Sequence, residues 1–215
     1  IENHDEPRGA STYLPEYAVN PRGIKMLAAV NILLRGLPFL YQGQEIGMRN
    51  CPMDSIEDYD DINTKDQYRT ALEAGCTEEE ALDACIRYSR DNARTPMQWS
   101  HEKEAGFTTG KPWLKVNPNY KEINVKESLE DEDSIFHYMQ KLIRMRKENL
   151  TAVYGDFKEY EPDDQQLYIY ERNYQEQKMF VVLNFSDQEA SFTMPEEWKK
   201  EEAKPLIGNY PEKPF

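Results

Sequence analysis

The chain has 215 residues, of which 39% are hydrophobic and 12% aromatic, enough to build one or two domains with a core. Its formal net charge is −14, from 40 acidic and 26 basic residues, so its surface repels phosphate backbones and anionic lipid. We therefore expect no nucleic-acid partner and no membrane partner, whereas a neutral substrate is compatible with this charge.

The three cysteines, Cys51, Cys76 and Cys85, have no metal-ligand spacing. An odd number of cysteines argues against a closed set of disulfides and favours a reducing compartment. No apolar run approaches the roughly 20 residues of a membrane span. We therefore expect a cytoplasmic protein that holds no metal ion and no cofactor.

The first strong pattern in chain order predicts a helix followed by a buried strand. Asn20 can cap the helix, Pro21 suits its first position, and Gly36 ends it. Residues 37–41 (LPFLY) then indicate a short, fully buried strand of a parallel sheet, and residues 42–47 (QGQEIG) indicate the loop at its C-terminal end. This order is one repeat of an α/β layer.

The next segment is polar and predicts a long loop that carries a helical piece near residues 64–74. Thr77 and Glu80 have the spacing of a capping box, so a second helix should run from there to about Ser89. Residues 90–126 are rich in Pro, Gly, Trp and Asn and predict an irregular stretch. A loop of this length inside a domain usually carries function.

A further helix is predicted after residue 128. Ser128 and Asp131 are the candidate caps, and basic residues in the last turn suit the helix dipole. Its apolar stripe consists of Ile135, Phe136, Met139, Leu142 and Ile143.

Beyond residue 149 the helical periodicity gives way to short β runs. These runs are residues 157–160, 167–170, 178–183 and 190–193, with turn residues between them. The pattern predicts a small antiparallel sheet domain over residues 150–215. A parallel α/β layer cannot stand on one or two strands. Residues 1–149 are therefore expected to be the last part of a barrel or open sheet whose beginning lies upstream.

Two motifs suggest a site. Asn3, His4 and Asp5 place an imidazole beside a carboxylate, and residues 89–99 (SRDNARTPMQW) add guanidinium groups and an aromatic surface. Together they can hold a ring that bears many hydroxyls. Taken alone, the first motif is more typical of a capped turn, and it is the second motif that favours a site.

These segments resemble the oligo-1,6-glucosidases, the α-glucosidase branch of the α-amylase superfamily. The resemblance rests on residues 2–8 (ENHDEPR), 41–48 (YQGQEIGM) and 89–99, and it is extended by residues 106–110 (GFTTG) and 116–120 (VNPNY). It covers essentially the whole chain, and residues 89–99 carry its most specific motif.

The resemblance implies a fold of class α/β plus β. Residues 1–149 would be the C-terminal portion of a catalytic (β/α)₈ TIM barrel, from the end of strand seven through helix eight. Residues 150–215 would be a small antiparallel β-sandwich domain that lacks its last strand. The catalytic nucleophile and the acid/base would lie upstream. The chain alone is therefore expected to be inactive, with the missing N-terminal part of the barrel as its partner.

The resemblance also implies roles for individual residues. Asp5 matches the third catalytic carboxylate of the family, which binds the 2- and 3-hydroxyls of the sugar, and His4 would donate to a neighbouring hydroxyl. Arg90 matches the arginine that pairs with an upstream aspartate to grip the terminal glucose, with a structural ion pair as the alternative. Glu45 is a candidate lining residue of the site or a support of its loop.

Three further side chains in residues 89–113 have two interpretations each. Arg94 is either a buried bridge or a support behind the site. Trp99 and Trp113 are expected to pack against the loop, and stacking on a sugar face is the alternative.

The expected function is that of a retaining, exo-acting glycoside hydrolase that releases glucose from α-1,6-linked or α-1,4-linked gluco-oligosaccharides. The first alternative is a sucrose isomerase or trehalulose-forming enzyme of the same branch. Those enzymes tend to carry an Arg- and Asp-rich loop after the first motif, whereas residues 9–16 here are GASTYLPE. The second alternative is a non-catalytic sugar-binding or transporter-associated relative.

Overall fold

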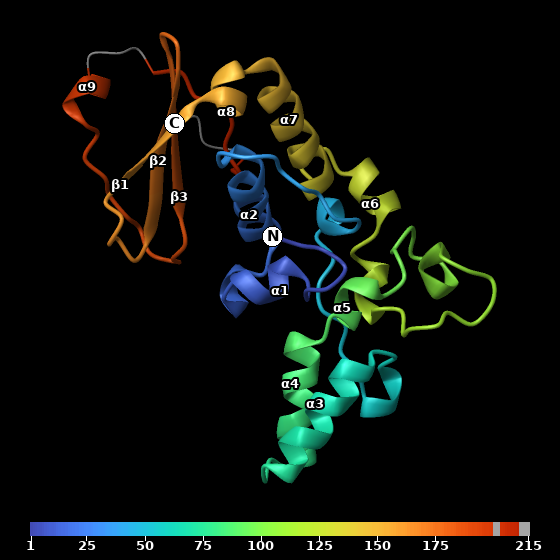
Figure 1. The fold of residues 1–215 in the computed structure, drawn as a ribbon. Coiled ribbons are helices and arrows are strands. Elements are labelled where there is room, and N and C mark those ends of the chain that lie inside the picture. Colours follow the sequence, from blue (N-terminus) through green and yellow to red (C-terminus); the bar gives the residue numbers. More distant parts are fainter. Residues whose placement is uncertain (200–202, 211–215) are drawn as a thin grey trace. The chain divides into compact units, whose positions relative to one another are not determined.

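A computed structural model describes residues 1–199 and 203–210 of the chain. The chain divides into two units, and Figure 1 shows their elements coloured along the sequence. The first unit holds Ile1–Ile24 and Phe39–His137, and the second holds Lys25–Pro38 and Tyr138–Phe215. The predicted domain boundary between residues 149 and 150 concerns the whole protein and stays a prediction.

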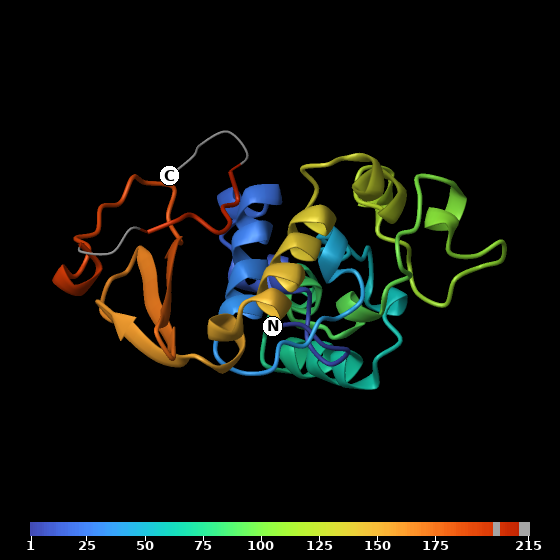
Figure 2. The ribbon, with the colours of Figure 1, turned by 90° about the horizontal axis from the view of Figure 1, so that it is seen from above.

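The first unit is built from short helices joined by long irregular segments. Its helices and 3₁₀ helices are α1 (Gly9–Tyr13), η1 (Glu16–Ala18), η2 (Gln44–Ile46), η3 (Ile56–Asp58), α3 (Ile62–Glu73), α4 (Glu78–Tyr88), α5 (Asp91–Arg94), η4 (Lys103–Gly106), η5 (Pro118–Lys121) and α6 (Val125–Glu130). Helices α3 and α4 lie side by side as a hairpin in both views (Figure 2).

Both predicted helices of this hairpin are confirmed. Helix α3 begins earlier than the predicted residue 64, because Asp61 caps it by accepting a hydrogen bond from the backbone N–H of Thr64 at 3.1 Å. Helix α4 begins with the predicted capping box. The N–H of Glu80 donates to Thr77 Oγ1 at 3.2 Å, and the N–H of Thr77 donates to Glu80 Oε2 at 2.8 Å.

Helix α2 (Pro21–Leu33) begins in the first unit and continues into the second. The predicted cap is confirmed, since Asn20 Oδ1 accepts hydrogen bonds from the backbone N–H groups of Arg22 at 3.0 Å and Gly23 at 3.2 Å. Each bond satisfies a donor that has no partner inside the helix.

The prediction that Ser128 and Asp131 cap the next long helix was wrong. Ser128 lies within a separate short helix, α6, which is capped by Asn124 at its start and by Asp131 at its end. Helix α7 (Ile135–Glu148) begins after it, and Ser134 Oγ accepts a hydrogen bond from a backbone N–H of its first turn at 3.2 Å. Asn124 therefore starts α6 as a separate helix. The apolar periodicity alone did not distinguish α6 from α7.

The prediction of a buried strand at residues 37–41 was also wrong for this structure. These residues have no regular secondary structure, and the side chains of Leu37 and Phe39 are 78% and 72% exposed. A strand forms only when at least one neighbouring strand pairs with its backbone. Within the described residues, the strands all lie between residues 156 and 184, and none of them pairs with this run.

The second unit carries the β-sheet. Its strands are β1 (Asp156–Tyr160), β2 (Leu167–Tyr174) and β3 (Gln177–Asn184), and its short helices are α8 (Leu150–Tyr154) and α9 (Glu196–Lys199). The strands are antiparallel in the order β1-β2-β3. Ile169 and Tyr170 of β2 are fully buried, so the middle strand forms the centre of this unit.

Three of the four predicted β runs are confirmed, and the run at residues 190–193 is not a strand. Instead of pairing through its backbone, this segment packs through Phe192, whose ring stacks on that of Phe180 at 5.5 Å between centroids. The described residues contain one three-stranded sheet, and the second layer of the predicted sandwich is not among them. The predicted lack of a last strand concerns the end of the chain and falls outside the described residues.

Two buried arginines tie the backbone of the second unit together. Arg146 on α7 donates to the carbonyls of Ile32 and Ala152, each at 2.7 Å. Arg172 on β2 donates to the carbonyls of Leu33 at 2.7 Å and Gly155 at 2.9 Å. Both guanidinium groups thus complement the negative, C-terminal end of α2, where backbone carbonyls have no partner within the helix.

Candidate functional site

The first predicted motif forms a tight turn. The backbone N–H of Asp5 donates to Asn3 Oδ1 at 2.7 Å, which is the capped turn that such a motif alone would suggest. The side chains of His4 and Asp5 stay 71% and 50% exposed, with His4 Nε2 3.0 Å from Asp5 Oδ2. The turn therefore presents an imidazole and a carboxylate to a ligand.

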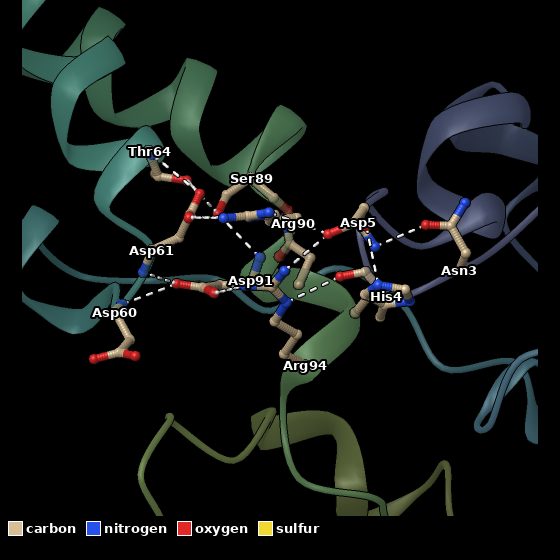
Figure 3. A network of polar contacts seen from close by, with 12 residues as sticks. Asn3, His4, Asp5, Asp60, Asp61, Thr64, Ser89, Arg90, Asp91 and Arg94 are labelled. Carbon is tan, nitrogen blue, oxygen red and sulfur yellow. Dashed lines mark hydrogen bonds and ion pairs between the residues drawn. The ribbon is translucent and has the colours of Figure 1, made fainter.

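The second motif holds the carboxylate of Asp5 from the other side (Figure 3). Asp5 Oδ1 accepts hydrogen bonds from Arg90 Nη1 at 3.1 Å and from Arg94 Nη2 at 3.0 Å. Arg94 also donates through Nε to the carbonyl of His4 at 2.9 Å. The structure thus brings together three of the predicted site residues, His4, Asp5 and Arg90, across about eighty-five residues of sequence.

Arg90 is fixed by a second aspartate. Its Nε and Nη2 both donate to Asp61 Oδ1, at 2.9 and 2.7 Å, and the side chain of Asp61 is only 2% exposed. Burial raises the pKa of Asp61, but hydrogen bonds from Arg90 and Thr64 more than offset it, so the pKa lies below its ordinary value. The resemblance implied an upstream aspartate as partner of Arg90. That pairing stays a prediction, and the partners seen here are Asp5 and Asp61.

Asp91 locks the backbone that presents Asp61. It is fully buried, and its Oδ2 accepts the backbone N–H groups of Asp60 at 2.9 Å and Asp61 at 2.8 Å. Ser89 Oγ accepts the N–H of Asp91 at 3.1 Å and lies 2.8 Å from Thr64 Oγ1. Helix α3 and the short helix α5 are therefore joined by buried polar contacts. These contacts fix the segment that carries Arg90 and Arg94.

Glu45 is not part of this network. Its Oε2 accepts the backbone N–H of Gly43 at 2.7 Å inside the turn that leads into η2. Gly43 has φ +90°, a conformation that glycine adopts without strain, and the carboxylate stabilises that turn. This contact favours the loop-support interpretation of Glu45, and a role in lining the site stays a prediction. Trp99 and Trp113 are 50% and 60% exposed, and both interpretations of these residues stay predictions.

Sequence reasoning missed Asp61 and Asp91 as parts of the site. Asp61 lies in a polar tract rich in aspartate, and the only local signal at that position is the spacing to Thr64, which indicates a helix cap. Asp91 is part of the recognised motif, but a buried carboxylate that binds two backbone amides thirty residues away leaves no periodicity to read.

The assembled site suits a neutral ligand rich in hydroxyls. An ionised carboxylate only accepts hydrogen bonds, and two guanidinium groups hold one oxygen of Asp5. Its other oxygen has His4 as its only polar partner among the described residues. A hydroxyl can therefore still donate to that second oxygen. Across residues 1–199 and 203–210, no group of three or more His, Cys, Asp or Glu residues is placed to hold a metal ion.

In the part of the chain that the structure describes, no helix has both the length and the apolar character needed to cross a membrane.

Comparison with known proteins matches two parts of the chain to two family models. Residues 1–155 match the model described as "Alpha amylase, catalytic domain", and residues 157–214 match the model described as "Maltogenic Amylase, C-terminal domain". An oligo-1,6-glucosidase of Bacillus cereus is 43% identical over 209 residues, which cover 97% of this chain and 38% of that protein.

Solved structures are also similar to this chain over its full length. The crystal structure of trehalose-6-phosphate hydrolase from Bacillus licheniformis has a TM-score of 0.93 and 42% identity, and the match covers 100% of this chain and 39% of that one. A trehalulose synthase mutant has a TM-score of 0.92 and 39% identity over 100% of this chain and 39% of that one. The chain therefore spans less than two fifths of the length of these relatives.

These matches confirm the predicted fold class, in which part of an α-amylase catalytic domain precedes a small antiparallel sheet domain. The family model covers well over half of the chain, and the similarity to the relatives extends along nearly all of it. The chain belongs to the α-amylase family.

Proposed function

We propose that this chain is the C-terminal part of a retaining, exo-acting glycoside hydrolase that releases glucose from α-1,6-linked gluco-oligosaccharides, with α-1,4 linkages as the alternative. The observation that carries this proposal is the exposed carboxylate of Asp5, which Arg90, Arg94 and His4 hold together in a chain of the α-amylase family. The relatives named oligo-1,6-glucosidase favour the α-1,6 linkage.

In this mechanism Asp5 is neither the nucleophile nor the acid/base. It accepts hydrogen bonds from the 2- and 3-hydroxyls of the glucosyl ring, and those bonds strengthen as positive charge builds at the anomeric carbon. Because the contact is stronger in the transition state than in the ground state, it accelerates the chemical step. His4 orients the ring, and Arg90 grips the terminal glucose, which restricts the enzyme to chain ends.

Retaining hydrolysis needs two further carboxyl groups about 5–5.5 Å apart, one as nucleophile and one as acid/base. We assign both to the N-terminal part of the barrel. The exposure of Leu37 and Phe39 supports this, since that part of the protein would cover these two large apolar side chains. The isolated chain is therefore expected to be inactive.

We place the protein in the cytoplasm. Its three cysteines are free thiols, two of them buried and one exposed, and this supports a reducing compartment.

Two other functions are compatible with the family. A sucrose isomerase or trehalulose-forming enzyme is favoured by the likeness to trehalulose synthase, and the absence of Arg and Asp from residues 9–16 argues against it. A non-catalytic sugar-binding relative is favoured by the exposure of the Asp5 turn, and it predicts that the chain alone binds isomaltose at millimolar concentrations.

The deciding experiment incubates the full-length protein with isomaltose, maltose and sucrose, and follows the products by proton NMR. The proposal predicts that the glucose released from the non-reducing end of isomaltose is the α anomer, so the released glucose at first contains more α anomer than the equilibrium mixture and then mutarotates. Trehalulose or isomaltulose from sucrose would favour the isomerase. An initial excess of the β anomer over the equilibrium mixture, or no turnover of any of the three sugars, would contradict the proposal.

A further inference from the structure

Arg8 is a buried charged residue whose side chain is only 1% exposed. Its Nη1 donates to Glu2 Oε2 at 3.3 Å and to the carbonyl of Gln42 at 2.7 Å, and its Nη2 donates to the carbonyl of Ala93 at 3.3 Å. The three acceptors lie in three segments of the first unit that are far apart in sequence. One guanidinium group therefore joins all three segments.

One of these contacts closes the turn that carries Asp5. Glu2 and Arg8 flank that turn on its two sides, and their side chains meet as an ion pair. The other oxygen of Glu2, Oε1, accepts the backbone N–H of Gly9 at 2.8 Å. Both ends of the turn are thus fixed to each other by buried contacts.

A second contact fixes the segment that approaches Asp5 from the other side. Ala93 lies between Arg90 and Arg94, the two residues that donate to Asp5 Oδ1. Its carbonyl accepts hydrogen bonds from Arg8 and from the hydroxyl of Tyr41, the latter at 3.1 Å. Arg8 therefore contacts both the turn that presents the Asp5 carboxylate and the segment of residues 90–94 that binds this carboxylate.

The buried Arg8 guanidinium imposes costs on its surroundings that lower the stability of the fold. A Cβ atom at Gly43 would lie 2.5 Å from Met48 Sδ and 3.0 Å from Arg8 Nη1, so only glycine fits there. Arg8 Nε is buried and has no hydrogen-bond partner among the described residues. Burial raises the pKa of Glu2. The charge of Arg8 only partly offsets this effect, so the pKa of Glu2 lies above its ordinary value. A buried ion pair with these features is a weak source of stability.

We propose that Arg8 is a positioning residue for the glycosidase reaction, because its guanidinium holds the Asp5 turn and the turn at residues 90–94 in one fixed frame. The inference rests on the proposed function and adds a residue to it. Arg8 does not touch the sugar. It acts by keeping Asp5 at the distance from the ring at which its hydrogen bonds strengthen in the transition state. Displacing such a group by about 1 Å is enough to cost about 10²-fold in rate.

The test uses the full-length enzyme with the variants Arg8→Lys and Arg8→Ala. A lysine keeps the charge but has a single nitrogen, which cannot reach the three acceptors that Nη1 and Nη2 reach together. We expect kcat to fall about 10²-fold in both variants with KM changed by less than about 5-fold, because the lost alignment matters mainly in the transition state. Thermal melts identify a temperature at which each variant is fully folded.

Arg172→Lys is the matched control, since Arg172 is also a buried arginine that donates to backbone carbonyls, but it belongs to the second unit. This variant should melt at a lower temperature and keep kcat within about 2-fold. Chemical rescue gives a second readout. Guanidinium chloride at a few tens of millimolar should raise kcat of Arg8→Ala by about 10-fold, with no gain in Arg172→Ala or with sodium chloride at the same ionic strength.

If Arg8→Ala does not fold, Glu2→Gln provides the same test, because it keeps the shape of the side chain and removes the charge that faces Arg8. We expect kcat to fall about 10-fold in that variant. The inference is overturned if folded Arg8→Lys retains kcat within about 2-fold of the wild type, or if Arg172→Lys loses kcat to the same degree. A wild-type enzyme without glucosidase activity would overturn the proposed function, and this inference with it.

Discussion

Asp61 holds Arg90 through a single carboxylate oxygen. Nε and Nη2 of Arg90 both donate to Asp61 Oδ1, and this leaves Nη1 to reach Asp5 at 3.1 Å. The other oxygen of Asp61 caps helix α3 by accepting from Thr64. One side chain therefore connects the start of a helix to the candidate site, and the orientation of Arg90 depends on where that helix begins.

Replacement of Asp61 should weaken the grip of Arg90 on the sugar. Asparagine has one acceptor oxygen and still caps a helix, so Asp61→Asn keeps α3 when that oxygen accepts from Thr64. Its NH₂ group then faces Arg90, which loses the charge and both hydrogen bonds to Asp61 Oδ1. We expect kcat/KM of the full-length enzyme for isomaltose to fall by about 10- to 100-fold, mostly through KM. The control is Asp60→Asn, an exposed neighbour whose side chain points away from Arg90 in Figure 3. An equal loss in both variants would contradict the prediction.

The same pair predicts a dependence of stability on pH. The pKa of Asp61 is lowered in the folded state, so its contribution to stability is present above the unfolded pKa of about 4 and is lost as pH falls through the lower, folded pKa. The difference in free energy of unfolding between wild type and Asp61→Asn should be constant above about pH 5 and shrink below about pH 4. Denaturant titrations between pH 7 and pH 3 measure it. A difference that already shrinks near pH 6 would assign the effect to another group.

The sequence predicts the parts of this fold that depend on residues close to one another in the chain. It does not predict the parts that depend on distant segments. Caps at Asn20 and Thr77 are readable because the side chain and the amide it binds lie two or three residues apart. The β runs of the second unit are readable because strand-forming residues cluster between turn residues, a local signal that needs no knowledge of the partner strand. The error at residues 37–41 has the opposite cause. An apolar run indicates a buried strand only if neighbours cover it, and those neighbours are not within the described residues.

The site was readable only where it coincided with recognised motifs. His4, Asp5 and Arg90 were predicted and lie together. Asp61 could not be found in the same way, because it serves as a helix cap locally and as an ion-pair partner only across twenty-nine residues. Arg8 belongs to a recognised motif, yet its role follows from acceptors spread over eighty-five residues, and no local pattern carries that information.

Loss of Arg146 should destabilise the second unit. Arg146→Met fills similar volume but leaves the carbonyls of Ile32 and Ala152 buried without these donors, which should lower the free energy of unfolding by about 2–4 kcal/mol. The matched control is Arg144→Met on the same helix, where the side chain is exposed and the expected change is below about 0.5 kcal/mol. Denaturant-induced unfolding of the full-length protein distinguishes them. Equal stability of the two variants would contradict the prediction that Arg146 stabilises the second unit.

The central claim is that Asp5 stabilises the transition state of glucosyl transfer, and the most direct measurement is the turnover of full-length Asp5→Asn on isomaltose. Asparagine has the same shape and the position is half exposed, so the melting temperature should stay close to that of the wild type, while kcat should fall by about 10²–10³-fold. A folded Asp5→Asn enzyme with nearly normal kcat would contradict the claim.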